Sequence, residues 1–490
     1  MNTEHSLLLG LDLGTTHVKA LVADWQGRVL AKHAAAVPLY PMGEGGMEQD
    51  LEEIWQATLL AIREAVKKVD ASRIRAIGVS SQGGAMQVFD QHGHAWGRVI
   101  SWLDGRGAAE DELLTKRLGP EWFLGRIRRA HSGLAIGQLM RLQKEPAFPP
   151  GAKIGFVGDT IVGRLCGQAV HDGTSCALTL LYNPALRDYD PDLLRELGLE
   201  RWRLPHLESP AKAAGGLTSE SAGLTGLVAG IPVSAAIHDQ YAAALSCGAV
   251  HPGDVMVGTG TAWVLLAVMD RLLEPVTKNA FVCHHVAPGL YGQIFSLHNG
   301  GSAFSWALNL LGWDKLSGAE IDAKLESVKP GSEGLSFWPL LAPTDVEGVA
   351  AGVKGRLDGL QLYHTSAQLL RSVVEGLVFE LNRFLNWVRH TNLPLRRLVM
   401  TGGAAASRIT PQVIADVTGL PIHVQDGSEG SVWGAVVLAR NLVGSDESLD
   451  QIAVKLSSSG RLLMPGDAAP IYQQLAARYL EYLPPPGASL

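Results

Sequence analysis

A short turn near the N-terminus combines residue types that bind phosphate and a divalent cation. Asp12, Gly14, Thr15 and Thr16 stand within five positions, and Lys19 follows three residues later. The carboxylate suits magnesium, the glycine lets backbone N–H groups approach an anion, and the hydroxyls and the ammonium can donate to phosphate oxygens. The turn is therefore predicted to bind a magnesium triphosphate. The alternative is an ordinary hairpin turn with a capping aspartate.

Two other glycine loops have a similar character. The turn Gly258-Thr-Gly-Thr261 matches the first one, and Gly260 stands 246 positions after Gly14 in a chain of 490 residues. This repetition favours two phosphate-binding loops that face one cleft. A third loop follows an apolar strand pattern and suits the close approach of an adenosine group. The residues predicted to contact the nucleotide in these two loops are Gly260, Thr261, Gly402, Gly403, Ala404 and Ser407.

Asp239 is the candidate for proton transfer. It follows the apolar strand pattern 233–237 and precedes alanine-rich helical residues, so it is expected at the carboxyl end of a strand, facing the cleft. An aspartate in that place is often a helix N-cap, which is the alternative. The neighbouring His238 is expected to be a hydrogen-bonded structural histidine rather than a metal ligand.

A third constellation joins Trp102, Asp104 and Arg106. An aromatic face, a carboxylate and a guanidinium suit a polyhydroxylated ligand. A surface turn with an ion pair is the alternative. The common P-loop, dinucleotide and zinc-protease fingerprints are absent from the sequence, so a nucleotide site must be built in another way.

The elements that position these residues repeat in the two halves of the chain. Segments 7–24 and 254–268 each have an apolar strand, a Gly/Thr turn and a second apolar strand, which predicts a duplicated β-hairpin. Asp50 is predicted to cap a helix of period 3.6, and strand 74–80 follows it. In the second half, Thr365 or Ser366 opens the longest predicted helix, and strand 398–401 leads into the paired glycines.

The composition is that of a soluble, core-forming globular protein with two or three domains. Hydrophobic residues make up 47% and charged residues 18%, and the 41 basic and 48 acidic residues give a net charge of −7 without a basic run. This balance argues against nucleic acid or an anionic membrane as partners. No apolar stretch reaches the roughly 20 residues of a membrane-spanning helix, and no signal peptide is recognisable, so a cytoplasmic location is expected. The four cysteines are expected to be reduced and buried.

The sequence resembles the FGGY family of carbohydrate kinases, within the actin, hexokinase and heat-shock ATPase superfamily, over nearly its whole length. Asp12 to Thr16 resembles the first phosphate loop, Trp102-x-Asp104-x-Arg106 resembles the sugar-side motif of xylulokinases, and His238-Asp239-Gln240 resembles the element with the catalytic aspartate. The most specific match is the C-terminal signature, which begins at Gly355 and ends in Ser372-Val-Val-Glu375. Gly434 and Ala435 resemble adenine-side positions.

The resemblance implies two actin-like (ribonuclease H-like) α/β domains in tandem around a central cleft. The expected limits are 1–245 for a sugar-binding domain and 246–475 for a nucleotide-binding domain, followed by a tail over 476–490 that is disordered from Pro484. The expected reaction is ATP- and Mg²⁺-dependent phosphorylation of a ketose such as D-xylulose, and a homodimer is compatible with it.

The predicted roles follow from the needs of phosphoryl transfer. Asp239 is the base, and Asp12 and Asp239 hold the metal. The phosphates are contacted by Gly14, Thr15, Thr16, Lys19, Gly260 and Thr261, and the sugar is contacted by Gln82, Gly83, Trp102, Asp104, Arg106, Asp239 and Gln240.

Departures from the xylulokinase pattern leave the sugar open. A histidine expected to touch the sugar is replaced in Gln82-Gly-Gly-Ala85. Another pentulose, a heptulose, a polyol or gluconate therefore remains an alternative substrate. A sugar sensor without activity is the second alternative class, although it would be expected to lose Asp12 or Asp239. A chaperone-like ATPase is the third, although no peptide-binding domain is visible after residue 475.

Overall fold

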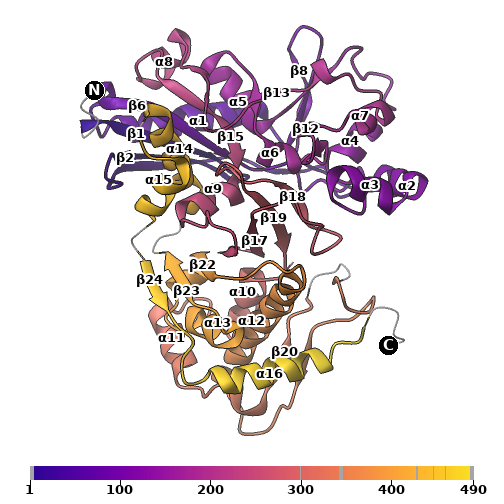
Figure 1. Ribbon diagram of the computed structural model, residues 1–490, viewed down its shortest axis with the longest axis vertical. Coiled ribbons are helices and arrows are strands. Elements are labelled where there is room, and N and C mark those ends of the chain that lie inside the picture. Colours follow the sequence, from indigo (N-terminus) through magenta and orange to yellow (C-terminus); the bar gives the residue numbers. More distant parts are fainter. Residues whose placement is uncertain are drawn as a thin grey trace.

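The computed structural model describes residues 5–297, 299–341, 346–425, 429–444, 446–457 and 460–485. Figure 1 shows two lobes, one built mainly from the first half of the chain and one mainly from the second half. Each lobe has a central sheet with helices packed on it, so the predicted α/β class with two domains is confirmed.

The first lobe contains a sheet in the order β13-β10-β15-β6-β1-β2-β3, with β14 beside β15, and a second sheet in the order β4-β5-β8-β7-β9. Its strands are β1 Leu7–Leu13, β2 His17–Asp24, β3 Val29–Ala36, β4 Tyr40–Pro41, β5 Met47–Gln49, β6 Ile74–Ser81, β7 Met86–Phe89, β8 Ala95–Ile100, β9 Lys153–Phe156, β10 Val170–His171, β11 Tyr182–Asn183, β12 Asp188–Tyr189, β13 His206–Leu207, β14 Ala213–Gly216 and β15 Pro232–His238. Its helices are α1 Leu51–Val66, α2 Ala108–Leu118, α3 Pro120–Ile127, α4 Ala135–Leu142, α5 Val157–Cys166, α6 Gly173–Ala177, α7 Pro191–Glu196, α8 Ser219–Thr225 and α9 Asp239–Ser246.

The second lobe contains a sheet in the order β18-β19-β17-β16-β22-β23-β24. Its strands are β16 Asp254–Thr259, β17 Trp263–Met269, β18 Phe281–His284, β19 Tyr291–Ser296, β20 Ser336–Trp338, β21 Arg356–Asp358, β22 Arg397–Gly402, β23 Ile422–Gln425 and β24 Gly460–Leu463. The helices of this part of the chain are α10 Gly301–Leu310, α11 Gly318–Glu326, α12 Ser366–His390, α13 Thr410–Thr418, α14 Gly430–Val443, α15 Leu449–Leu456 and α16 Ala469–Glu481.

The duplicated hairpin is confirmed. β1 pairs antiparallel with β2 and parallel with β6, while β16 pairs antiparallel with β17 and parallel with β22. The chain thus places one Gly/Thr turn at the same point of each sheet, because the two turns close equivalent hairpins. In the first turn the register sets Asp12 opposite Lys19.

The predicted helix starts are also confirmed. The Asp50 side chain accepts hydrogen bonds from the backbone N–H groups of Glu52 and Glu53 at the start of α1. The longest helix, α12, starts with a capping box in which Thr365 and Gln368 satisfy each other's backbone N–H groups.

One helix crosses from the second half of the sequence into the first lobe. Figure 1 shows α14 packed on β1 and β6. Two glycines make this close approach possible, because an added Cβ at Gly10 would lie 2.4 Å from the Val432 carbonyl and one at Gly78 would lie 1.8 Å from the Ala435 carbonyl. The expected division near residue 245 falls at the end of α9, but the first lobe includes this late helix as well.

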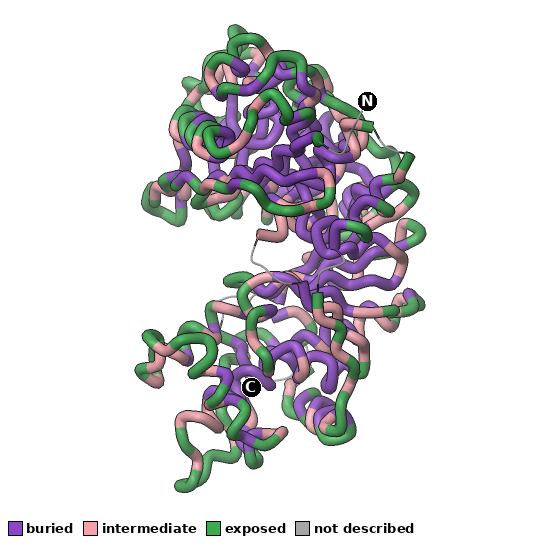
Figure 2. The backbone as a smooth tube through the Cα atoms, turned by 90° about the vertical axis from the view of Figure 1, so that its left-hand side faces the viewer, coloured by how far each residue is buried: buried purple, intermediate pink, exposed green. Residues whose placement is uncertain are grey.

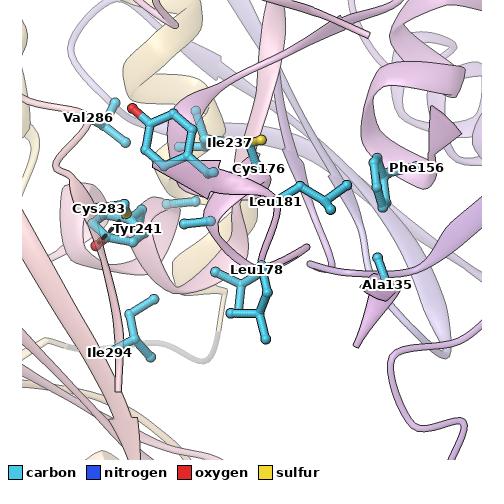
Figure 3. Packing of buried hydrophobic residues seen from close by; sticks show 14 of the residues in the cluster. Ala135, Phe156, Cys176, Leu178, Leu181, Ile237, Tyr241, Cys283, Val286 and Ile294 are labelled. Atoms are coloured by element: carbon cyan, nitrogen blue, oxygen red, sulfur yellow. Dashed lines mark hydrogen bonds between the residues drawn. The ribbon is translucent and has the colours of Figure 1, made fainter. Parts of the chain in front are cut away.

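Buried side chains from both halves of the chain form one continuous cluster where the lobes meet. Figure 3 shows Tyr241 of α9 beside Cys283 of β18, with Ile237, Leu178 and Ile294 nearby. The Cys283 thiol donates to the Tyr241 hydroxyl over 3.0 Å. Figure 2 shows that buried chain fills the interior of each lobe and that exposed chain forms the rims. All four cysteines are free and buried, as predicted.

The C-terminal tail begins later than expected. α16 continues past residue 476 to Glu481, and Ala476 and Tyr479 are buried. The Tyr479 hydroxyl donates to Glu380 of α12 over 2.8 Å, so this segment is held in the core. Residues 486–490 of the expected disordered tail lie outside the described residues. Within the described ranges, no helix is long and apolar enough to span a membrane.

Candidate active site

Asp12 lies at the end of β1 in a buried position between two serine hydroxyls. Ser80 of β6 donates to one carboxylate oxygen over 2.9 Å, and Ser431 of α14 donates to the other over 3.0 Å. Burial raises the pKa of the Asp12 carboxyl, and the negative charge of Asp239 raises it further, whereas Lys19 lowers it. Asp12, Asp239 and Lys19 therefore lie close enough for their charges to interact.

Asp239 is the first residue of α9, directly after β15. His238 occupies the N-cap position and no side chain caps the helix, so the N-cap alternative for Asp239 does not apply. The Asp239 side chain is 32% exposed, and its Oδ1 lies 3.3 Å from Nε2 of the buried His238. Burial lowers the pKa of His238, although Asp239 opposes that effect, so this imidazole is neutral at pH 7. Asp239 thus offers an accessible carboxylate at a rigid strand end.

Trp102, Thr15, Gln82 and Gln49 form one hydrogen-bonded group. The Thr15 hydroxyl donates to Gln82 Oε1 over 3.0 Å and accepts from Trp102 Nε1 over 3.1 Å. Gln82 donates to the Gln49 side chain, which in turn donates to the Thr15 carbonyl. Thr15, a predicted phosphate contact, is therefore hydrogen-bonded directly to Gln82 and Trp102, two predicted sugar contacts. Gln49 was missed by sequence reasoning, because a lone glutamine beside a helix cap gives no signal.

Asp104 does not fit its predicted role as a sugar contact. Its side chain has no exposed surface, and both carboxylate oxygens already accept hydrogen bonds. The donors are the backbone N–H of Met47, the Gln138 amide, and the backbone and guanidinium of Arg106. Arg106 also pairs with Glu48 over 2.6 Å. The alternative of a turn with an ion pair is the better description, and only Trp102, which is 46% exposed, presents a face to a ligand.

Gly83 and Gln240 lie close to the other site residues. An added Cβ at Gly83 would come within 2.6 Å of the His238 ring, so that ring occupies the space a side chain at 83 would need. The Gln240 side chain reaches the second lobe and lies beside Gly258. A Cβ added at this glycine would be 3.2 Å from Gln240 Oε1. The exposed Thr16 and the partly buried Gly14 complete the first turn, whose tight form is closed by a hydrogen bond from the Gly14 N–H to the His17 carbonyl.

The second and third glycine loops line one cavity of about 710 Å³ in the second lobe. Gly402 has a φ of +99°, which favours glycine, and Thr259 lies directly against it. Gly403 instead faces space, since an added Cβ would meet only the Thr259 carbonyl at 3.6 Å. The predicted lining residues are Gly260, Thr261, Gly403, Ala404 and Ser407, and the residues missed include Gly301, Ser302, Phe304 and Asp322.

The Ser407 hydroxyl has a structural role at the edge of this cavity. It donates to Asp322 over 2.7 Å and accepts from the backbone N–H groups of Ile409 and Thr410 at the start of α13. Gly434 lies where α14 packs against α9. It does not line the cavity, and an added Cβ there would lie 1.9 Å from the Ala242 carbonyl, so it allows α14 to approach α9.

The C-terminal signature ends in a buried ionic network. Glu375 of α12 accepts from the Gly331 N–H, the Ser332 hydroxyl, the Arg371 guanidinium and the Tyr472 hydroxyl. Arg371 and Glu375 are almost completely buried. This signature position therefore joins α12 to the segment before β20 and to α16 within the second lobe.

Taken together, the repeated sheet, the glycine-lined cavity and the neighbouring carboxylates define a two-lobed α/β nucleotide-dependent transferase. Residues 7–246 match the FGGY family of carbohydrate kinases, N-terminal domain, and residues 255–440 match the C-terminal domain of the same family. The chain belongs to the FGGY family of carbohydrate kinases, and its reaction is ATP-dependent phosphorylation of a sugar.

Several proteins resemble the chain over most of its length. It is 30% identical over 453 residues to a glycerol kinase of Gloeobacter violaceus, covering 88% of this chain and 87% of the relative. It is 28% identical over 493 residues to the L-xylulose/3-keto-L-gulonate kinase of Escherichia coli, covering 96% and 95%. The crystal structure of xylulose kinase from Rhodospirillum rubrum has the same fold, with a TM-score of 0.88, 24% identity, and coverage of 97% and 98%.

Proposed function

We propose that this kinase phosphorylates a ketose, with D-xylulose as the first candidate. The placement of the Asp239 carboxylate carries the proposal, because it is accessible at a strand end and shares its surroundings with Asp12 and Lys19. Relatives named xylulose kinase and L-xylulose kinase support a ketose. Another pentulose, a heptulose, a polyol or gluconate is the alternative, since relatives named glycerol kinase and gluconokinase have comparable similarity.

The chain's own residues would act by position and charge. Asp239 would accept the proton of the attacking sugar hydroxyl, since its carboxylate is accessible and its histidine neighbour is neutral. Lys19, Thr16 and the backbone around Gly260 and Thr261 would bind the phosphates. The exposed Trp102 would contact the sugar, while Gln82 and Gln49 would hold Thr15 and Trp102 in place. Positioning and electrostatics of this kind dominate phosphoryl transfer.

Magnesium and ATP both fit the residues present. No cluster of three or more metal-binding side chains occurs in the ranges that the structure describes, which leaves the pair Asp12 and Asp239. A pair suits Mg²⁺, which keeps several water molecules and takes the rest of its ligands from phosphate oxygens. When bound, the magnesium complex of ATP supplies the phosphoryl group and neutralises charge on it. The glycine-lined cavity, open above Gly403, has room for the adenosine.

The test is a screen of ketoses, polyols and aldonic acids with the purified protein, in which ADP release and the phosphorylated product are both measured. We expect the highest kcat/KM with a ketose. A higher kcat/KM with a polyol or an aldonic acid would replace the ketose as substrate class. ATP hydrolysis without any phosphorylated product would instead favour the chaperone-like ATPase, and binding of a sugar without turnover would favour the sensor.

We further propose that the enzyme works in the cytoplasm, where its four free cysteines would stay reduced. A homodimer is the alternative to a monomer. Light scattering of the purified protein distinguishes the two states by mass.

A further inference from the structure

A second cavity, of about 460 Å³, lies in the first lobe and contains none of the residues assigned to the active site. Its walls come from β9, the middle of α5 and the segment 202–206 that leads into β13, with further residues from the β7–β8 hairpin, the start of α1 and Ala169. A volume of this size is in the usual range for small-molecule sites. The proposed phosphorylation reaction does not use this cavity.

Four basic side chains stand in a lining that is otherwise mostly apolar. Lys153, Arg164, Arg203 and His206 all border the cavity. Arg164 and Arg203 pair with Glu52 and Glu200, respectively, and neither of these glutamates lines it. Within the described ranges, no ion pair involves Lys153.

Asp159 is the single acidic residue in the lining, and burial raises its pKa to about 8. It is therefore mostly protonated at pH 7. Because Glu52 and Glu200 offset the charges of Arg164 and Arg203, the excess positive charge at the walls comes from Lys153. A cavity with this charge attracts an anion.

Two polar groups of the lining lack a partner although they are buried. Thr160 is 9% exposed and its hydroxyl has no hydrogen bond, and the Nε of Arg203 also has none. A buried polar group without a partner is destabilising, so such groups call for a ligand or a bound water. An added Cβ at Gly155 would lie 2.8 Å from the Thr160 hydroxyl oxygen, so the glycine keeps the wall open beside it.

An aromatic side chain stands beside these polar groups. Trp202 is 58% exposed, and the Arg203 guanidinium lies 5.4 Å from the centre of its ring. An exposed tryptophan face suits the carbon skeleton of a polyhydroxylated compound, and the guanidinium fork suits phosphate oxygens.

We propose that this cavity is a second binding site, for a phosphate monoester of a small polyhydroxylated compound. Lys153 and Arg203 bind the phosphate, the Thr160 hydroxyl binds a hydroxyl of the ligand, and Trp202 covers its carbon skeleton. The site is distinct from the sugar and nucleotide sites, and its ligand is bound without being converted.

Calorimetric titration of the full chain tests this proposal, with glucose 6-phosphate, glucose and inorganic phosphate as the three probes. The test variant is Lys153→Met/Arg203→Gln. The matched control is Lys67→Met/Arg28→Gln, which removes the same charges from exposed positions of the same lobe. We expect glucose 6-phosphate to bind the wild type and the control equally and the test variant at least tenfold more weakly. All three proteins should keep the same kcat and KM for the sugar substrate.

Four outcomes would overturn the proposal. Equal affinity of the test variant and the wild type for glucose 6-phosphate would place any binding elsewhere, and an equal loss in the control would reduce it to general charge attraction. If glucose binds as tightly as glucose 6-phosphate, the site does not recognise the phosphate group. If inorganic phosphate binds as tightly as the ester, the site does not recognise the carbon skeleton. None of these outcomes affects the proposed kinase activity, which is measured separately.

Discussion

Replacement of Asp239 by asparagine tests the proposed proton transfer most directly. Asparagine has nearly the same size and can keep the side chain's hydrogen bonds, but it cannot accept a proton at neutral pH. Neither neighbour can replace the lost base, because Asp12 is buried between two serine hydroxyls and His238 is 8% exposed. Loss of a general base typically costs 10²- to 10⁴-fold, and we expect about 10³-fold in kcat. That factor corresponds to about 4 kcal/mol of transition-state stabilisation.

The Asp239→Asn substitution also changes the pKa of Asp12, but in the direction that favours the ionised carboxylate. The charge of Asp239 raises the pKa of Asp12, so its removal lowers that pKa. Loss of activity in Asp239→Asn therefore cannot come from protonation of Asp12. The assay combines kcat from ADP release with calorimetric affinities for sugar and ATP and with the melting temperature. A folded Asp239→Asn protein that keeps kcat within about threefold of the wild type would refute the assignment of the base.

Three further predictions concern the cavity, the signature network and a buried acid. Gly403→Val should leave the fold intact, because a Cβ there meets only the Thr259 carbonyl at 3.6 Å. The larger side chain should fill the cavity and weaken ATP binding at least about tenfold. An unchanged calorimetric affinity for ATP would contradict this prediction. Glu375→Ala leaves the buried Arg371 without its carboxylate and should lower the free energy of unfolding in urea by about 3–5 kcal/mol, and a loss below about 1 kcal/mol would argue against the network. Burial raises the pKa of Asp159 to about 8 in the folded state, above its ordinary value. The folded state therefore binds more protons than the unfolded state between about pH 4 and 8. The stability that Asp159 contributes falls as the pH rises, by up to about 1.4 kcal/mol per pH unit. Asp159→Asn should therefore lose less stability than the wild type between pH 5 and 8. The free energy of unfolding is measured in urea at several pH values, and the same slope against pH for both proteins would disprove the prediction.

Local patterns were sufficient to predict the frame of the molecule. Apolar runs on both sides of the turns at Gly14 and Gly260 predicted both hairpins, and the caps at Asp50 and Thr365 predicted two helix starts, because turns and caps are decided by neighbouring residues. The role of Asp104 was predicted wrongly for the opposite reason. A motif identifies a carboxylate, but only the folded chain shows that its partners use both of its oxygens.

Contacts between distant segments were the other part that sequence reasoning could not supply. Ser431 contacts Asp12 across 419 positions of sequence, and no local pattern relates the two. The glycines at 10, 78 and 434 each permit a close approach of α14, but in the sequence they are indistinguishable from glycines in ordinary strands and helices. The cavity around Lys153 was missed because its walls come from several separate segments.

The position of α14 has a consequence for how the protein is made. A ribosome completes the whole of the first lobe's sheet long before it reaches residue 443, the end of that helix. Until then the apolar face formed by Leu8, Leu21 and Ala76 has no cover, since Val432 and Val436 of α14 provide it in the finished protein. The nascent chain therefore presents an open hydrophobic surface during most of its synthesis, which is the kind of surface that holdase chaperones bind. The early half, expressed by itself, should aggregate, and the active site receives Ser431 only at the last stage of assembly.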